Sequence, residues 1–333
     1  MSPVISIILL NWNGREDLLD NCLNSIKNQT FKDWELFMVD NGSTNGSLEY
    51  VQEKHPWVPI VKFDQNYGYS GGLNKQVPAT KGKYLVFIQN DVKLTPNFLE
   101  VLYNKAESDP EIGILVPKQM KYDGSGLLNF GVLVDLLGYP MPPRGDKFFY
   151  ADGAIMFLRR DLFVDLGMFD DKHFAFFEDC DLSWRTRIVG KKIVLVPEAV
   201  AYHWSGGTVT GGALRQGKLE TTLWRRQLGE RNNLRNVIKN YQWFNLLWVL
   251  PLYLLVNIWE ILFFLLTGKL KIISKVYLNS YWYNLKNLGD TLRERRKIQS
   301  KRKVSDGEIM KQMENTIAKL KILFSSGMPK FKE

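Results

Sequence analysis

Cysteine is scarce in this chain of 333 residues, which contains only Cys22 and Cys180. Two cysteines form neither a disulfide framework nor a cysteine-based metal cluster. This composition fits a reducing compartment. No histidine lies near Cys180 in the sequence to activate its thiol, so we interpret Cys180 as a small packing residue rather than a nucleophile.

The N-terminus lacks the features of a signal peptide. Its first apolar run, residues 4–10, has no basic segment before it. The run is also too short for the apolar region and cleavage site of a signal peptide. We interpret it as a buried strand and expect the globular part of the chain to stay in the cytoplasm.

Positive charge is in excess, with a net charge of +9 and a pI of about 9.3. Such a balance favours an anionic partner, which could be nucleic acid, anionic lipid or a phosphate-rich substrate. A chain of this length is expected to form one large domain, or one domain with an appended module.

Short apolar runs alternate with helical patterns in the first part of the chain. Residues 4–10 are β-branched and continuously apolar, as in a parallel strand that is covered on both faces. Residues 15–28 have helical spacing. This alternation predicts an α/β fold with a doubly wound sheet. Further strands are expected at residues 35–39, 58–63, 84–88, 112–116 and 150–157, with a last short strand at 193–196.

Polar residues gather where these strands end. Asp40 follows the second strand, the glycine-rich turn 66–74 follows the third, and Asp91 follows the fourth. Ligands bind at the carboxyl ends of the strands in open α/β sheets, so these residues should line one crevice. The turn can offer backbone N–H groups to phosphate. Its glycines lack the Gly-x-Gly-x-x-Gly spacing, which disfavours a nicotinamide-dependent enzyme.

Two carboxylates in this pattern have a specific chemical interpretation. Asp91 is placed to hold Mg²⁺ or Mn²⁺ against a diphosphate, although it could instead cap a helix. A helix that begins near Glu178 would pair Asp181 with Arg185 and leave Asp179 pointing elsewhere. Asp179 is then a candidate general base. The alternative is an acidic first turn that only complements the helix dipole.

Six stretches in this order resemble the rhamnosyltransferase-like branch of the family-2 glycosyltransferases. They are residues 4–13, 39–44, 66–74, the triplet Gln89-Asn90-Asp91, residues 167–170 with 176–185, and His203. The resemblance covers residues 3–240. It implies a GT-A (Rossmann-like) nucleotide-diphospho-sugar transferase fold, a UDP- or dTDP-sugar donor, a divalent metal (Mn²⁺ or Mg²⁺) and inversion at the anomeric carbon.

The resemblance also assigns roles to residues. Asp179 takes the position of the catalytic base, Asp91 and His203 would hold the metal, and Asp40 would contact the base of the nucleotide. Gln89 stands where the family has its first acidic residue, which should weaken metal binding. The full set expected to bind the nucleotide or substrate is Asn11, Asn13, Asp40, Asn66, Gly68, Gly71, Asn74, Asn90, Asp152, Gly153, Glu178 and Arg185.

The composition changes after residue 240, so we divide the chain into a catalytic domain, 1–240, and a helical, membrane-associating module, 241–333. Residues 243–266 are almost wholly apolar and near the length that spans a bilayer. Pro251, Asn257 and Glu260 interrupt them, which favours helices lying in the membrane interface over a single transmembrane span. A soluble core helix or a dimer face is the remaining interpretation.

The rest of this module supports contact with a membrane. Residues 291–303 hold seven basic residues and one acidic residue, a run that attracts anionic lipid headgroups. A solvated helix face is the alternative, and no nucleic-acid-binding motif accompanies the run, so nucleic acid is not the expected partner. Residues 310–324 have helical spacing, typical of a terminal helix that packs back or forms a homodimer.

The sequence therefore predicts a peripheral or monotopic enzyme at the cytoplasmic face of the membrane. It would transfer a sugar from a nucleotide donor to a hydroxyl of a lipid-linked glycan acceptor. One alternative is a polyprenyl-phosphate sugar synthase, in which the lipid phosphate itself is the acceptor. The other is a catalytically silent protein that binds a sugar nucleotide or a carbohydrate.

Overall fold

The computed structural model describes residues 2–142, 147–205, 213–215, 218–327 and 330–332. The chain divides into two compact units. The first unit contains Met1–Gly131, Tyr150–Thr186 and Lys191–Thr208, and the second contains Val132–Phe149, Arg187–Gly190 and Val209–Glu333. The units thus divide the chain at other places than the expected boundary at residue 240. Helix α7 (Leu223–Asn240) belongs to the second unit because it packs against α10 and α11.

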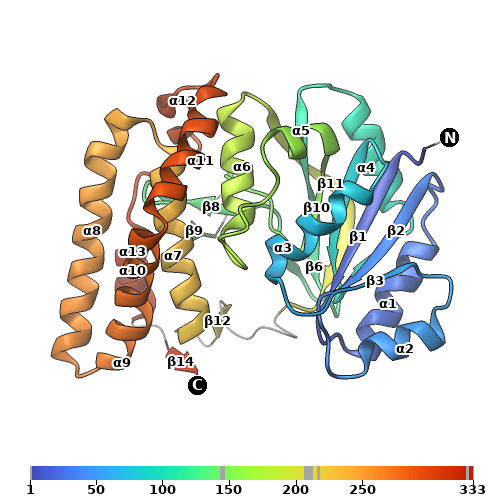
Figure 1. The fold of residues 1–333 in the computed structure, drawn as a ribbon, viewed down its shortest axis with the longest axis horizontal. Helices are drawn as coiled ribbons and strands as arrows, with labels where there is room; N and C mark the ends of the chain where they lie inside the picture. Colours follow the sequence, from blue (N-terminus) through green and yellow to red (C-terminus); the bar gives the residue numbers. More distant parts are fainter. Residues whose placement is uncertain (1, 143–146, 206–212, 216–217, 328–329, 333) are drawn as a thin grey trace. The chain divides into compact units, whose positions relative to one another are not determined.

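A mixed sheet forms the centre of the first unit (Figure 1). Its strands follow the order β3-β2-β1-β4-β10-β6-β11-β5, and β7 pairs with β6 at Gln119 and Met120, beyond the residues of β6 that pair with β10. The bounds are β1 Ile5–Asn11, β2 Trp34–Asp40, β3 Ile60–Lys62, β4 Tyr84–Gln89, β5 Val92–Leu94, β6 Ile112–Lys121, β7 Leu127–Asn129, β10 Ile155–Arg159 and β11 Lys192–His203.

The half of the sheet formed by β3, β2, β1 and β4 is parallel, as expected. The other half contains antiparallel strands, which the sequence did not predict. The central strands β1 and β4 are buried almost throughout, as continuous apolar runs should be, whereas β3 is half-buried to exposed. Strand β10 runs antiparallel to β4 and β6, and β5 runs antiparallel to β11. Strand β11 is longer than the short strand expected at 193–196, because it continues past an irregularity after Val196 to pair with β5.

Helices cover this sheet. Helix α1 buries Leu18, Leu19, Cys22, Leu23 and Ile26 at helical spacing. Burial raises the pKa of the Cys22 thiol, and Cys180 is buried as well, so both cysteines lie in packed surroundings. The helices of this part are α1 Glu16–Lys27, α2 Ser47–Lys54, α3 Gly68–Gln76, the 3-10 turn η1 Val77–Ala79, α4 Phe98–Glu107, α5 Arg160–Asp165 and α6 Glu178–Ile188.

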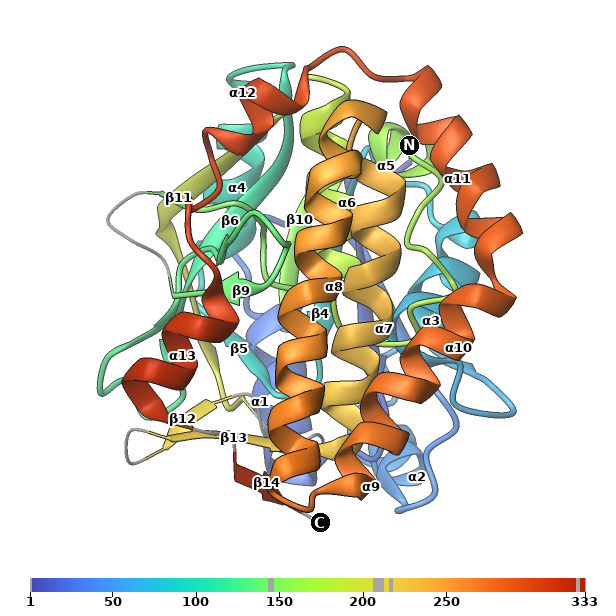
Figure 2. The same cartoon turned by 90° about the vertical axis from the view of Figure 1, so that its left-hand side faces the viewer.

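The second unit is mainly helical (Figure 2). Its helices after α7 are α8 Trp243–Leu266, α9 Leu270–Ile272, the π-helical turn η2 Ile273–Leu278, α10 Asn279–Lys286, α11 Leu288–Ser300, α12 Asp306–Met310 and α13 Ala318–Ser326. Its short strands are β8 Leu133–Val134, β9 Pro140–Met141, β12 Ala213–Arg215, β13 Lys218–Thr222 and β14 Lys330–Lys332.

The expectation of one helix over residues 310–324 is wrong. Helix α12 ends at Met310, and α13 begins only at Ala318. Between them, Glu314 donates its backbone N–H to Val134. The Asp135 carboxylate then accepts a hydrogen bond of 2.7 Å from the backbone nitrogen of Ala318, the first residue of α13. These contacts hold the intervening segment out of a helix.

Candidate active site

The acidic segment forms the start of helix α6, which begins at Glu178 as expected. The expected pairing is also present, because Arg185 Nε lies 2.9 Å from Asp181 Oδ2 and both side chains are buried. The remaining guanidinium nitrogens donate to the carbonyl oxygens of Leu166 and Met168, each at 2.8 Å. Arg185 therefore holds the acidic segment in place, and these contacts occupy the guanidinium that we expected to bind substrate.

The loop before α6 has an unusual backbone. Phe174, Phe176 and Phe177 all have positive φ angles, between 60° and 69°, although none is glycine. Each such residue costs about 1–3 kcal/mol, and such residues gather at functional sites. The loop rests against helix α3, where the carbonyl oxygen of Phe174 accepts a hydrogen bond from the backbone nitrogen of Ser70. The packing of this loop thus sets the direction of Asp179.

Asp179 lies half-buried on the first turn of α6. Its Oδ2 atom accepts a hydrogen bond of 3.0 Å from the backbone nitrogen of Gly153. Burial, together with the negative charge of Asp152, raises the pKa of Asp179 to about 7. A carboxylate with a pKa near the working pH is suited to accept a proton. Glu178 is buried beside it, and its charge contributes to raising the pKa of Tyr69, which burial raises most.

A second group of polar side chains surrounds Asp91. His203, at the end of β11, places Nε2 3.5 Å from Asp91 Oδ1. Its Nδ1 lies 3.1 Å from Oε1 of Gln119, whose Nε2 in turn lies 3.3 Å from Asp152 Oδ1. Burial opposes a charged imidazole, but the carboxylate of Asp91 and the charge of Asp152 outweigh it and raise the pKa of His203.

Asp91 and His203 fit a divalent cation. One carboxylate oxygen and one imidazole nitrogen lie close enough to contact the same ion, and Mn²⁺ accepts both ligand types. The hydrogen bond of Nδ1 to Gln119 leaves Nε2 directed to Asp91, as in many histidine metal ligands. Gln89, the last residue of β4, is half-buried and brings no charge to this site.

Asn11 is the centre of a buried network at the ends of β1 and β2. Its Nδ2 donates to Asp40 Oδ1 at 2.9 Å and to the hydroxyls of Ser43 and Ser47. Its Oδ1 accepts a hydrogen bond of 2.6 Å from Asn90. Asp40 is fully buried, and its second oxygen accepts from the backbone nitrogen of Ser43. Asn13 is less buried and accepts from the backbone nitrogen of Thr44.

The glycine-rich turn forms the start of helix α3. Asn66 caps it by accepting a hydrogen bond of 2.7 Å from the backbone nitrogen of Gly68. Asn74 is buried and bonds to both backbone groups of Phe169, so it anchors the loop that leads to Asp179. Gly71 is half-buried, with a Tyr67 side chain nearby. Among the four residues of this turn that we expected to bind a ligand, Asn66 and Gly71 are half-buried, whereas Gly68 and Asn74 are buried.

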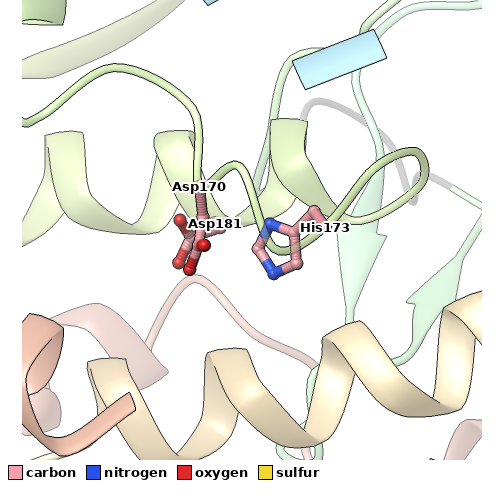
Figure 3. Close-up of side chains that lie close together, drawn as sticks. All are labelled: Asp170, His173 and Asp181. Carbon is pink, nitrogen blue, oxygen red and sulfur yellow. The ribbon is translucent and has the colours of Figure 1, made fainter. Parts of the chain in front are cut away.

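A further group of side chains lies close to the acidic segment. Figure 3 shows Asp170, His173 and Asp181 pointing toward one another, and their potential ligand atoms lie within 4.8 Å of one another. Asp181 is already paired with the positive charge of Arg185, which works against a cation there. We therefore place the candidate metal at Asp91 and His203 and interpret this group as part of the support of α6.

Sequence reasoning missed two residues of the site. Gln119 joins His203 to Asp152 from β6, and Tyr69 donates a hydrogen bond to the carbonyl oxygen of Gly153. Both contacts join residues that are far apart in the sequence, so no local pattern marks them. The glycine-rich sequence around Tyr69 predicts a turn there, but it does not predict the contact of Tyr69 with Gly153.

The comparisons with known proteins decide the family. The family model described as "Glycosyl transferase family 2" matches residues 6–167, which include β1 to β4, β10 and Asp91. Residues 6–167 belong to glycosyl transferase family 2. The resemblance stated from the sequence motifs is thereby confirmed.

Two curated relatives and one solved structure extend this result. A cholesterol galactosyltransferase of Borreliella burgdorferi is 33% identical over 32% of this chain and 30% of its own length. An N-acetylglucosaminyl-diphospho-decaprenol L-rhamnosyltransferase of Mycobacterium tuberculosis is 24% identical over 61% of this chain and 76% of its own. The match thus spans under a third of the first of these relatives.

The solved structure is GalNAc-T7 with UDP, GalNAc and Mn²⁺, with a TM-score of 0.56 and 16% identity over 72% of this chain and 48% of that one. This likeness shows the fold alone. The fold is GT-A, as the sequence predicted.

Proposed function

We propose that this protein is a metal-dependent, inverting glycosyltransferase. It would move a sugar from a UDP- or dTDP-sugar to a hydroxyl of a lipid-linked glycan at the cytoplasmic face of the membrane. The observation that carries the proposal is Asp179, a half-buried carboxylate with a pKa raised to about 7, in the same unit as the Asp91–His203 pair. A base and a site for the leaving diphosphate are the two requirements of such a transfer.

Asp179 would act on the acceptor. Its carboxylate takes the proton of the acceptor hydroxyl while the hydroxyl oxygen forms a bond to the anomeric carbon and the bond from that carbon to the diphosphate breaks. Gly153 lies directly beside this carboxylate, since a Cβ there would be in van der Waals contact with it, 3.4 Å from Asp179 Oδ2 and 3.5 Å from the Tyr69 hydroxyl. Attack from the side opposite the leaving group inverts the configuration at the anomeric carbon.

Asp91 and His203 would hold the divalent cation, which would stabilise the charge that develops on the leaving diphosphate. The backbone N–H groups of Gly68 and Ser70 at the start of α3 already donate to Asn66 and Phe174, so the metal would be the main partner of the diphosphate. Gln89 brings no negative charge to the cation. The negative charge of Asp152, which lies close enough to act on His203, would compensate for this. The nucleotide would lie along the edge formed by Asn13 and Asn66, with the buried network of Asn11, Asp40 and Asn90 beneath it.

The lipid-linked acceptor is supported by two observations. The mycobacterial relative is named for a decaprenol diphosphate acceptor. The second unit exposes large apolar side chains along α8, including Phe244 and Leu247, and basic side chains of α11 such as Arg296 and Lys297. Nothing in the described residues favours nucleic acid as the anionic partner over lipid.

A transfer assay tests this function. The chain is incubated with a panel of UDP- and dTDP-sugars, Mn²⁺ and either a polyprenyl-diphosphate sugar or a polyprenyl phosphate. Transfer to the diphosphate-linked sugar that EDTA abolishes supports the proposal. A product formed only on polyprenyl phosphate would make the protein a polyprenyl-phosphate sugar synthase. Binding of a sugar nucleotide without transfer would make it a silent binding protein.

A further inference from the structure

The second unit carries a large exposed apolar surface, which we call the apolar face. On α8, Phe244 is 79% exposed, Leu255 61% and Leu266 87%. Beyond this helix, Leu278 of η2 and Trp282 and Leu285 of α10 are each more than half exposed. Exposed apolar patches of this extent mark a binding surface. The other members are Trp243, Leu247, Trp248, Leu254, Ile258, Trp259, Leu262, Leu265, Leu270 and Leu288.

The opposite side of α8 is packed along its whole length. Leu246 and Val249 are buried near its start, Tyr253 and Asn257 in its middle, and Phe264 near its end. Phe264 packs with Val276 and Tyr277 of η2. Figure 2 looks onto α8 with α7 beside it, and the two helices contact each other. One stripe of α8 therefore belongs to the protein core, and the rest is exposed.

The middle of this packed stripe is charged. Glu260 of α8 lies 3.0 Å from Arg226 of α7 and 2.6 Å from Lys319 of α13. The same two cations also contact Glu230 of α7, at 3.0 Å and 2.7 Å. The Tyr277 hydroxyl donates to Glu260 at 2.8 Å. Asn257 and Glu260, which interrupt the apolar sequence of α8, are thus held by charges inside the second unit.

We propose that α8, η2 and α10 lie in the plane of the membrane, with the apolar face in its interface and the charged network above it. A helix of 24 residues is about 36 Å long, enough to cross the hydrocarbon core. If it crossed, the helices that cover its packed stripe would lie at the same depth. Arg226, Glu230 and Lys319 would then stand within the hydrocarbon, which is strongly unfavourable. If α8 lies in the plane of the membrane, its apolar face contacts lipid and its packed stripe stays inside the second unit.

The charge around the apolar face favours anionic lipid as the occupant. Residues 261–289 contain four lysines and no acidic residue. Lys269, Lys271, Lys275 and Lys286 are all exposed, and Lys286 Nζ lies 5.0 Å from the centre of the Trp282 ring. Lysines at the edge of an inserted apolar surface reach the headgroups. The orientation of α8 in the membrane is inferred from the second unit alone. The proposed function supplies only which face of the membrane is bound, the cytoplasmic one.

Depth measurements on the full chain test the proposal. Single cysteines introduced by Phe244→Cys, Leu255→Cys and Leu266→Cys carry an environment-sensitive fluorophore, and the native Cys22 and Cys180 are buried. Vesicles contain phosphatidylcholine with phosphatidylglycerol and lipids brominated at different depths. We expect all three probes to enter the membrane and to be quenched best by bromine near the headgroups. Val164→Cys on α5, 47% exposed, is the matched control that stays in water.

Two outcomes would overturn the proposal. Deep quenching at Leu255→Cys with shallow quenching at both ends would show a transmembrane span. Probes that stay in water at all three positions would show that the apolar face does not bind lipid. Replacing the four lysines with Gln should weaken binding to the anionic vesicles by more than about tenfold and leave binding to pure phosphatidylcholine unchanged. Transfer to a water-soluble acceptor, measured in parallel, reports on the proposed function separately.

Discussion

The Oδ2 atom of Asp179 lies 3.0 Å from the backbone nitrogen of Gly153. This contact joins the start of α6 to the segment that precedes β10, and it leaves the carboxylate facing the charge of Asp152. The hydrogen bond favours the ionised form of Asp179, while burial and the Asp152 charge favour the protonated form. The balance sets the pKa near 7, and three predictions follow from that value.

The first concerns catalysis. Asp179→Asn keeps the shape of the side chain but cannot accept a proton, and its single amide oxygen keeps only one of the two hydrogen bonds that the carboxylate accepts, from the backbone nitrogens of Gly153 and Cys180. We expect the rate of transfer to fall by about 10²–10⁴, with donor and Mn²⁺ affinity unchanged. Calorimetry and an assay of transfer would measure the two effects on one preparation. Turnover close to that of the unmodified protein would remove Asp179 from the role of base.

The second concerns stability. The folded protein keeps a proton on Asp179 up to about pH 7, whereas the ordinary value of 3.8 applies to the unfolded chain. The folded state therefore binds more protons between these values, and the contribution of Asp179 to stability decreases as the pH rises through them. We expect Asp179→Asn to raise Tm at pH 8 but not at pH 4. An equal change in Tm at both pH values would contradict the assigned pKa.

The third concerns the pH profile. A base must be ionised, so kcat/KM should fall below about pH 7. Removing the negative charge in Asp152→Asn should lower the pKa of Asp179 and move the acid limb of the profile to lower pH. The position of this limb, rather than the absolute rate, is the measurement, because Asp152 also lies near the proposed metal site. An unshifted limb would mean that Asp152 does not act on the base.

The sequence predicted the local features of this site well. The end of β2 at Asp40, the turn after β4 that contains Asp91, the start of α6 at Glu178 and the pairing of Asp181 with Arg185 all follow from patterns within a few residues. The contacts that govern the properties of Asp179 and His203 join residues that are far apart in the sequence. Gln119 meets His203 84 residues away, and the antiparallel direction of β10 places Asp152 beside the site. Such contacts depend on the pairing of distant strands, which one sequence does not reveal.

The second unit illustrates the same limit. The apolar and polar positions of α8 were readable from the sequence, whereas the partners of Glu260 were not. Arg226 and Lys319 come from helices on either side of α8 in the chain. The basic run 291–303 predicts a lipid-binding surface, yet Arg295 donates to backbone carbonyls of Ile238 and Tyr241 inside the unit. Only some of that run remains available to lipid.

The fourth prediction concerns Gln119. The carboxylate of Asp152 can only accept, so the amide nitrogen of Gln119 faces it and the amide oxygen faces His203. His203 then carries a hydrogen on Nδ1 and presents Nε2 to the metal. Gln119→Leu should weaken Mn²⁺ binding by about 10–100-fold. Gln119→Glu loses the donor to Asp152 and sets a second carboxylate beside it, but it can still accept from Nδ1 and should therefore lose less Mn²⁺ affinity than Gln119→Leu.

The chain has only three histidines, so nitrogen NMR can follow the ring of His203 directly. We expect Gln119→Leu to change the tautomer of His203 in the metal-free protein and Gln119→Glu to preserve it. An unchanged ring together with weaker Mn²⁺ binding would show that Gln119 acts in another way. Because the NMR measurement needs neither metal nor donor, it stays informative whatever the protein transfers.

The last prediction concerns Gly68, where the glycine-rich turn meets the loop of Asp179. Gly68 has φ of +75°, and a Cβ there would stand 2.7 Å from the ring of Phe174 and closer to its carbonyl oxygen. Gly46 has φ of +84° with nothing within 4 Å of its Cβ position, so it is a matched control for backbone strain alone. We expect Gly68→Ala to displace Phe174 and with it Asp179, so that kcat falls well below that of Gly46→Ala, while both variants lose a similar amount of stability from the backbone. Equal kcat in the two variants, measured with saturating donor, would mean that the turn and the catalytic loop are not coupled.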